Sequence, residues 1–184
     1  LAAYTMMLAN GGVRYKTHLV HSVRSYDGSV ETVVQPEIAD RLDIDATTLK
    51  TVKDGMIAVA SVSGGTAYSS FRDAPYTVAA KTGTAQITDA RSREGRYYLG
   101  SMVAYFPADA PRYTVLTTIE TRAQAGKAYY GGPLAGPVVK RMVDYIFNRG
   151  RDWYGRVDDG GPRRYPDRMK GGDIAQVRRV ADRL

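Results

Sequence analysis

The apolar and polar positions predict a helix at the start of the chain and a β-hairpin after it. Leu1, Tyr4 and Leu8 recur at helical spacing, and Asn10–Gly12 supplies a C-terminal stop. The chain opens within this helix, without an N-cap residue or an initiator methionine, so we expect a piece of a longer protein. The segments HLVHSVRS and SVETVVQ flank Tyr26–Gly28, a pattern typical of a hairpin.

A second helix is predicted to begin after Asp45, which is suited to capping it, and to end at Ser63–Gly65. Three β-rich segments follow, at Tyr76–Gln86, Leu99–Phe106 and Tyr113–Glu120. The positions expected on the inner face of the helix are Leu49, Val52, Met56, Val59 and Ala60.

The turn Pro107–Pro111 between the second and third strands favours an antiparallel pair. A loop at Gln124–Gly132 leads to an amphipathic helix over about Pro133–Phe147. We therefore expect an α/β protein of the α+β kind, with an antiparallel sheet flanked by helices. The positions expected to face inward on the last helix are Val138, Met142, Tyr145 and Ile146.

The composition changes after Asn148. Residues 150–172 are rich in glycine, proline and charge, which is typical of a linker, and Asp173 is placed to cap a last helix over 173–184. We therefore expect one folded body at 1–149, a linker, and a helix that begins a truncated C-terminal module.

Composition and charge exclude some classes of function. The 184 residues include no cysteine, so disulfides and thiol chemistry are excluded, and no apolar run has the length of a membrane span. The net charge of +7 is compatible with an anionic polymer or lipid surface. The basic residues are scattered and no nucleic-acid-binding motif is present, so we expect no nucleic-acid partner. His18 and His21 lack assignable carboxylate partners, and no metal site is predicted.

The run Lys81-Thr82-Gly83-Thr84-Ala85-Gln86 is the strongest chemical signal, because it follows an apolar β-rich segment directly. On a strand, Lys81 and Gly83 face one way, and Thr82 and Thr84 the other. The lysine supplies positive charge, the hydroxyl groups suit a carboxylate, and an edge strand offers free backbone groups to an extended peptide. A strand end with a solvated lysine is the alternative interpretation.

The chain resembles the C-terminal half of the transpeptidase domain of class B penicillin-binding proteins, the enzymes that cross-link peptidoglycan in cell division and elongation. Lys-Thr-Gly is one of three signatures of these enzymes and of serine β-lactamases. The resemblance covers roughly residues 1–147, with one small departure, since Ala80 stands where glycine is common. The segments that carry it besides the motif are AAYTMMLANGGVRYKTHLV, LKTVKDGMIAVASVSGGTA, LGSMVAYFPADAPRYTVLTTIE and YYGGPLAGPVVKRMVDYI.

The two other family motifs are absent. No serine has a lysine three positions later, and none has an asparagine two positions later. We therefore expect the nucleophile to lie outside this chain and the chain alone to be inactive.

The resemblance implies a serine-type D-Ala-D-Ala transpeptidase that binds penicillin and uses no cofactor. Lys81, Thr82, Gly83 and Thr84 are the implied catalytic residues, with Thr82, Thr84 and Gln86 binding substrate. The implied partners are the stem peptide of a lipid-linked precursor, β-lactams, the N-terminal half of the enzyme, and a glycosyltransferase within the division or elongation machinery. The implied location is the periplasmic face of the bacterial inner membrane. A β-lactamase or carboxypeptidase and a non-catalytic β-lactam sensor remain as alternatives.

Overall fold

The computed structural model describes residues 1–26, 30–88 and 95–149. The predicted linker at 150–172 and the predicted helix at 173–184 lie outside the described residues, as does the tip of the predicted hairpin. None of the helices in the described ranges combines the length and hydrophobicity that crossing a membrane requires.

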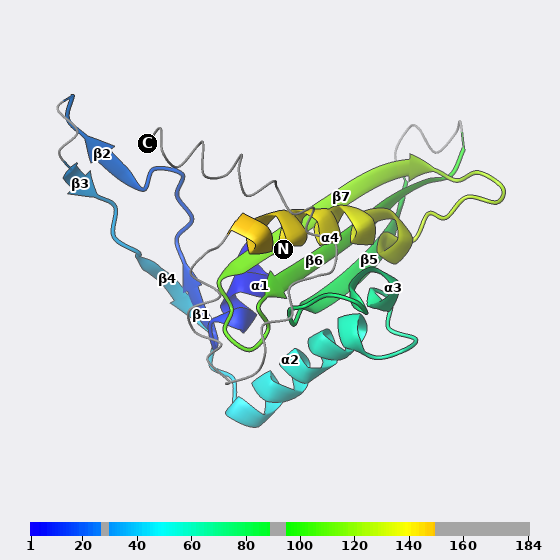
Figure 1. Ribbon diagram of the computed structural model, residues 1–184, viewed down its shortest axis with the longest axis horizontal. Coiled ribbons are helices and arrows are strands. Elements are labelled where there is room, and N and C mark those ends of the chain that lie inside the picture. Colours follow the sequence, from blue (N-terminus) through cyan, green and yellow to red (C-terminus); the bar gives the residue numbers. More distant parts are fainter. Residues whose placement is uncertain (27–29, 89–94, 150–184) are drawn as a thin grey trace, which may run out of the picture. The chain divides into compact units, whose positions relative to one another are not determined.

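A three-stranded antiparallel sheet forms the centre of the body formed by residues 1–149 (Figure 1). Its strands are β5 (Ala79–Ile87), β6 (Tyr97–Phe106) and β7 (Tyr113–Arg122), in that order across the sheet. This confirms the three predicted strands and their antiparallel pairing. Among the described strands, β5 has a single neighbour, so the strand that carries the Lys-Thr-Gly run is an edge strand.

Helices cover both faces of this sheet. The helices α1 (Ala2–Ala9) and α2 (Ala46–Ser61) pack on one face, where Leu8 and Met56 join a core cluster with Tyr105 of β6. The long helix α4 (Gly131–Arg149) packs on the other face, where Gly136 lies against Met102. Successive side chains of β6 alternate between these two cores, as a strand requires.

The predicted first helix is confirmed, and of its three regularly spaced apolar residues only Leu8 is buried. Leu1 and Tyr4 are 76% and 55% exposed, whereas Thr5 and Leu8 are buried. The segment is apolar almost all round, so helical spacing alone does not select the face that meets the sheet. Gly11 and Gly12 have positive φ angles of 74° and 95°, which explains the glycine pair at the end of the helix.

The predicted hairpin is confirmed by β2 (Ser22–Arg24) and β3 (Val30–Val33), which pair antiparallel. The segments that flank this hairpin in the sequence form a second antiparallel pair, β1 (Val13–Tyr15) and β4 (Ile38–Arg41). We did not predict this pair, because each of its strands has only a few residues and little apolar alternation.

The capping role of Asp45 is confirmed. Its carboxylate accepts a hydrogen bond from the backbone N–H of Thr48 at 2.9 Å, and Met56 and Ala60 are buried on the inner face of α2. Gly64 has a φ of +90° in the turn that follows. This turn leads to a short helix, α3 (Tyr68–Phe71).

Helix α4 begins at Gly131, two residues before the predicted start, and its predicted inner face is wrong. Val138 and Met142 are 40% and 39% exposed, and Tyr145 is 57% exposed. Small residues face the sheet instead, because they let the helix axis approach the strands closely. The buried residues of α4 are Gly131, Gly132, Ala135, Gly136, Val139 and Val143.

Polar and aromatic contacts fix the far end of α4. The hydroxyl of Tyr76 donates to Asp144 at 2.5 Å, and Lys140 contacts both oxygens of the same carboxylate at 2.6 Å. The ring of Tyr76 also lies 4.8 Å from that of Phe147. Burial, reinforced by the hydrogen bond to Asp144, raises the pKa of Tyr76, so its hydroxyl stays protonated and serves as the donor.

Candidate active site

Along the chain into β5, the residues change from buried to exposed at the lysine of the Lys-Thr-Gly run. Val78, Ala79 and Ala80 are 4%, 0% and 0% exposed, and Lys81 is exposed. The apolar residues anchor the strand, and its charged part begins where burial ends. The lysine therefore avoids the desolvation cost that a position inside the core would impose.

Lys81 carries an uncompensated positive charge within the described part of the chain. Its Nζ donates to the carbonyl oxygen of Thr82, and no ion pair joins it to a carboxylate of the described residues. An exposed ammonium group of this kind is available to an anionic ligand.

The charge and the hydroxyl groups lie on opposite faces of β5, as predicted. Lys81 is paired with Val103, on the face of the sheet that α1 and α2 cover. Thr82 and Thr84 follow the other alternation and belong to the α4 face. A Cβ at Gly83 would lie 2.6 Å from Ser101 Oγ, so the glycine leaves room for its cross-strand neighbour.

The first residue of α4 contacts this strand directly. The backbone N–H of Gly131 donates to Thr84 Oγ1 at 3.0 Å. A Cβ at Gly131 would lie 2.2 Å from the carbonyl oxygen of Gly83, which only glycine avoids without a shift of the backbone. The start of α4 thus places a helix N-terminus, with its partial positive charge, beside the motif.

Thr66, in the turn after α2, contacts the other motif hydroxyl. Its Oγ1 lies 2.7 Å from Thr82 Oγ1. A Cβ at Gly132 would lie 2.2 Å from the carbonyl oxygen of Thr66. The two glycines that begin α4, Gly131 and Gly132, therefore leave room for β5 and for the Thr66 turn. We did not single out Thr66 from the sequence. The available signal was its place in SGGTA, directly after two glycines.

Three tyrosines gather beyond the motif. Gln86, exposed on β5, pairs with Tyr98 of β6. The ring of Tyr98 stacks on that of Tyr129 with centroids 4.4 Å apart, and the hydroxyl groups of Tyr129 and Tyr130 lie 3.1 Å apart. The hydrogen bond with Tyr130 raises the pKa of Tyr129 above its ordinary value. The three tyrosine rings therefore form an aromatic surface next to Gln86, beyond the Lys-Thr-Gly run.

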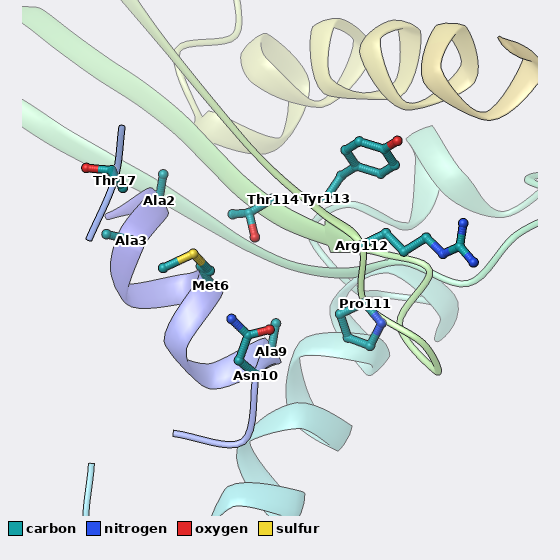
Figure 2. A pocket seen from close by; sticks show the side chains of 10 residues that line it. All are labelled: Ala2, Ala3, Met6, Ala9, Asn10, Thr17, Pro111, Arg112, Tyr113 and Thr114. Atoms are coloured by element: carbon teal, nitrogen blue, oxygen red, sulfur yellow. The ribbon is translucent and has the colours of Figure 1, made fainter. Parts of the chain in front are cut away.

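A pocket of about 350 Å³ lies elsewhere, between α1 and the segment that starts β7 (Figure 2). Figure 2 shows side chains of Met6 and of Pro111–Thr114 around it. No residue of the motif or of the Thr66 turn lines it. The candidate site is instead the open edge of β5, with Lys81 on one face and hydroxyl groups on the other.

This arrangement can bind an anion and an extended peptide, but it lacks a nucleophile of the serine–lysine type. The 184 residues contain no Ser-x-x-Lys sequence. The site therefore supplies charge, hydroxyl groups and backbone groups.

Comparison with known proteins identifies close relatives. Residues 1–144 match the family model described as the penicillin binding protein transpeptidase domain. Penicillin-binding protein 2A of Bacillus subtilis is 38% identical over 128 residues, which is 65% of this chain and 18% of the relative. Peptidoglycan D,D-transpeptidase MrdA of Escherichia coli is 31% identical over 150 residues, which is 77% of this chain and 22% of the relative.

Solved structures show the same fold. Pseudomonas aeruginosa PBP2 in complex with WCK 5153 aligns with a TM-score of 0.61 and 27% identity, over 82% of this chain and 30% of that one. PBPA of Mycobacterium tuberculosis aligns with a TM-score of 0.62 and 20% identity, over 79% of this chain and 33% of that one. The chain thus spans about a fifth of the length of these curated relatives and about a third of the solved chains.

Proposed function

The chain belongs to the penicillin-binding protein transpeptidase family, and on that premise we propose that it forms the carboxylate-binding side of a class B peptidoglycan D,D-transpeptidase. The observation that carries the proposal is the edge strand β5, which presents the exposed Lys81 and two hydroxyl groups next to the N-terminus of α4. Relatives named peptidoglycan D,D-transpeptidases support the reaction. A solved structure of similar fold, penicillin-binding protein A from M. tuberculosis, is an imipenem acyl-enzyme complex, which is consistent with the proposed acyl-enzyme.

Each motif residue has a distinct role in this proposal. Thr82 and Thr84 bind the terminal carboxylate of the stem peptide, or the carboxylate of a β-lactam, through their hydroxyl groups. Lys81 raises the local potential and favours the deprotonated nucleophile. The backbone N–H of Thr84 stabilises the oxyanion together with the N–H of the serine, and Gln86 lies along the substrate peptide.

The reaction proceeds in two acyl transfers. A serine outside residues 1–184 attacks the carbonyl carbon between two D-alanines, the peptide bond breaks, and the departing D-alanine amine takes up the proton. An amine of a neighbouring strand then attacks the resulting ester. The cross-link forms, and the serine oxygen recovers a proton.

The partners and location follow from the same proposal. The substrate is the stem peptide of peptidoglycan or its lipid-linked precursor, so the enzyme works on the periplasmic face of the inner membrane. It acts beside a glycosyltransferase in the division or elongation machinery. The N-terminal part of the same enzyme completes the catalytic site.

The test uses the full-length enzyme that carries this chain. We expect stoichiometric labelling by fluorescent penicillin, detected by intact mass. With a stem pentapeptide and an acceptor amine, we expect D-alanine release and a cross-linked product. Labelling followed by hydrolysis alone would identify a carboxypeptidase or β-lactamase, and labelling without turnover of the peptide would identify a sensor. An enzyme that penicillin does not label would overturn the proposal.

A further inference from the structure

We propose that Thr66 is a positioning residue that orients the Thr82 hydroxyl toward the carboxylate of the ligand. This inference rests on the proposed function, and it concerns a residue outside the Lys-Thr-Gly run. The contact that carries it is the 2.7 Å separation of the two Oγ1 atoms.

The backbone of Thr66 is held on both sides. A Cβ at Gly65 would lie 2.4 Å from the carbonyl oxygen of Val59, so the chain before Thr66 lies tight against the end of α2. Ala67 is 0% exposed, and its N–H donates to the same Val59 oxygen at 3.0 Å. Gly132 of α4 lies against the Thr66 carbonyl. The hydroxyl of Thr66 therefore extends from a fixed backbone toward β5.

Either hydroxyl group could donate in this contact, and the proposed role requires one of the two directions. A hydroxyl group carries one proton and accepts through two lone pairs. If Thr82 is to donate its proton to a carboxylate, its oxygen must act as the acceptor toward Thr66. Thr66 is then the donor, and the Thr82 proton is directed away from it, toward the ligand.

Thr84 shows the same arrangement with a different donor. The N–H of Gly131 occupies an acceptor position on Thr84 Oγ1, since an amide nitrogen can only donate. With Thr66 as the donor, both motif hydroxyl groups receive a hydrogen bond from outside β5 and keep their own proton available. The donor to Thr82 is then the side chain of Thr66, and the donor to Thr84 is the backbone N–H at the start of α4.

A purely structural role explains the Thr66 contact less well. Thr66 is exposed and Thr82 is half-buried, and a hydrogen bond between groups that water reaches adds little to folding stability. Orientation of a donor before the ligand arrives, in contrast, saves reorganisation during the reaction.

The experiment measures acylation of the full-length enzyme by penicillin G and by its neutral methyl ester. We expect Thr66→Val to slow acylation by penicillin G by about threefold to tenfold, the effect of one hydrogen bond in the transition state. We expect no such change with the ester, which lacks the anionic group. Thr66→Ser should restore the rate, and Thr66→Val should add nothing in a Thr82→Val background. Thr51→Val is the matched control, since Thr51 is exposed and its hydroxyl donates to the carbonyl oxygen of Thr47 within α2.

Several outcomes would overturn the assignment. A Thr66→Val enzyme that reacts with penicillin G at the wild-type rate shows that the contact has no role in acylation. If Thr66→Val slows acylation by penicillin G and by its methyl ester equally, Thr66 has only a structural role in the turn. The same conclusion follows if the rate losses of Thr66→Val and Thr82→Val are additive. A wild-type enzyme that does not react with penicillin overturns the proposed function, and the role of Thr66 with it.

Discussion

Gly131 donates its backbone N–H to the hydroxyl of Thr84 at 3.0 Å, and this bond joins the start of α4 to the motif strand. The two residues are separated by 47 positions in the chain. The packing of α4 on the sheet and the orientation of a hydroxyl group that we propose to bind substrate therefore depend on the same glycine.

Gly131→Ala should destabilise the protein and impair the site together. The added Cβ would lie 2.2 Å from the Gly83 oxygen, a clash with backbone that costs about 1–3 kcal/mol. Gly55→Ala is the control, because a Cβ at Gly55 meets nothing within 4 Å inside α2 and should stabilise the helix by about 1 kcal/mol. Thermal melts of both variants test this, and equal shifts would contradict the close packing of α4.

Lys81→Ala should abolish most acylation and leave the fold intact. Loss of a preorganised charge typically lowers the rate by about two to three orders of magnitude. The melting temperature should hardly change, because Lys81 is exposed and fills no core volume. The rate of acylation against β-lactam concentration is the measurement. A wild-type rate, or a loss explained by unfolding, would make Lys81 a structural residue.

Thr84→Val should have a smaller effect than Lys81→Ala. The substitution removes the hydroxyl that accepts from Gly131, but it keeps the backbone N–H proposed for the oxyanion. We expect about a tenfold loss for one charge-assisted hydrogen bond, seen as weaker β-lactam binding before acylation. If Thr84→Val loses as much as Lys81→Ala, the hydroxyl contributes more than carboxylate binding.

Asp45 should make the stability of α2 dependent on pH. Hydrogen bonds from Thr48 lower the pKa of Asp45 below its ordinary value of 3.8. Its ionised form therefore stabilises the folded state above pH 3.8, and this contribution is lost as the pH falls through the lower folded-state pKa. Asp45→Asn keeps a capping oxygen without titrating. The wild-type advantage over Asp45→Asn in thermal melts should shrink below pH 3.8, and a constant difference would contradict this role.

Residues 1–184 alone should form no covalent adduct with fluorescent penicillin, because they contain no Ser-x-x-Lys sequence. Intact mass after incubation is the measurement, with the full-length enzyme as the positive control. Stoichiometric labelling of the isolated chain would require a different nucleophile within it.

The sequence pattern predicted the sheet and the main helices well. The β-rich segments and the turns between them identified β5, β6 and β7, and Asp45 and the glycine stops identified the ends of α1 and α2. These features depend on local chemistry, which a single segment contains. The motif itself was also local, and its exposed lysine follows directly from where the apolar run ends.

The inner face of α4 and the contact made by Thr66 could not be predicted in this way. Large apolar residues suggested a buried face at Val138 and Met142, but the helix meets the sheet through Ala135 and Gly136. Close approach of a helix to a sheet favours small side chains, which hydrophobic spacing does not weigh. Thr66 reaches Thr82 across 16 positions, a tertiary contact that no local pattern encodes.

The division of β5 into a charged face and a hydroxyl face makes the site sensitive to the length of the chain before it. Alternation has a period of two residues, so one inserted residue that shifts the register of the strand would exchange the two faces. The ammonium group would then lie among the small residues of α4, and the hydroxyl groups would lie on the α2 side. The buried residues that fix the register of the strand are Val78, Ala79 and Ala80. A substitution within this apolar run keeps the register, whereas an insertion or deletion moves the side chains of the motif to the opposite faces of the sheet.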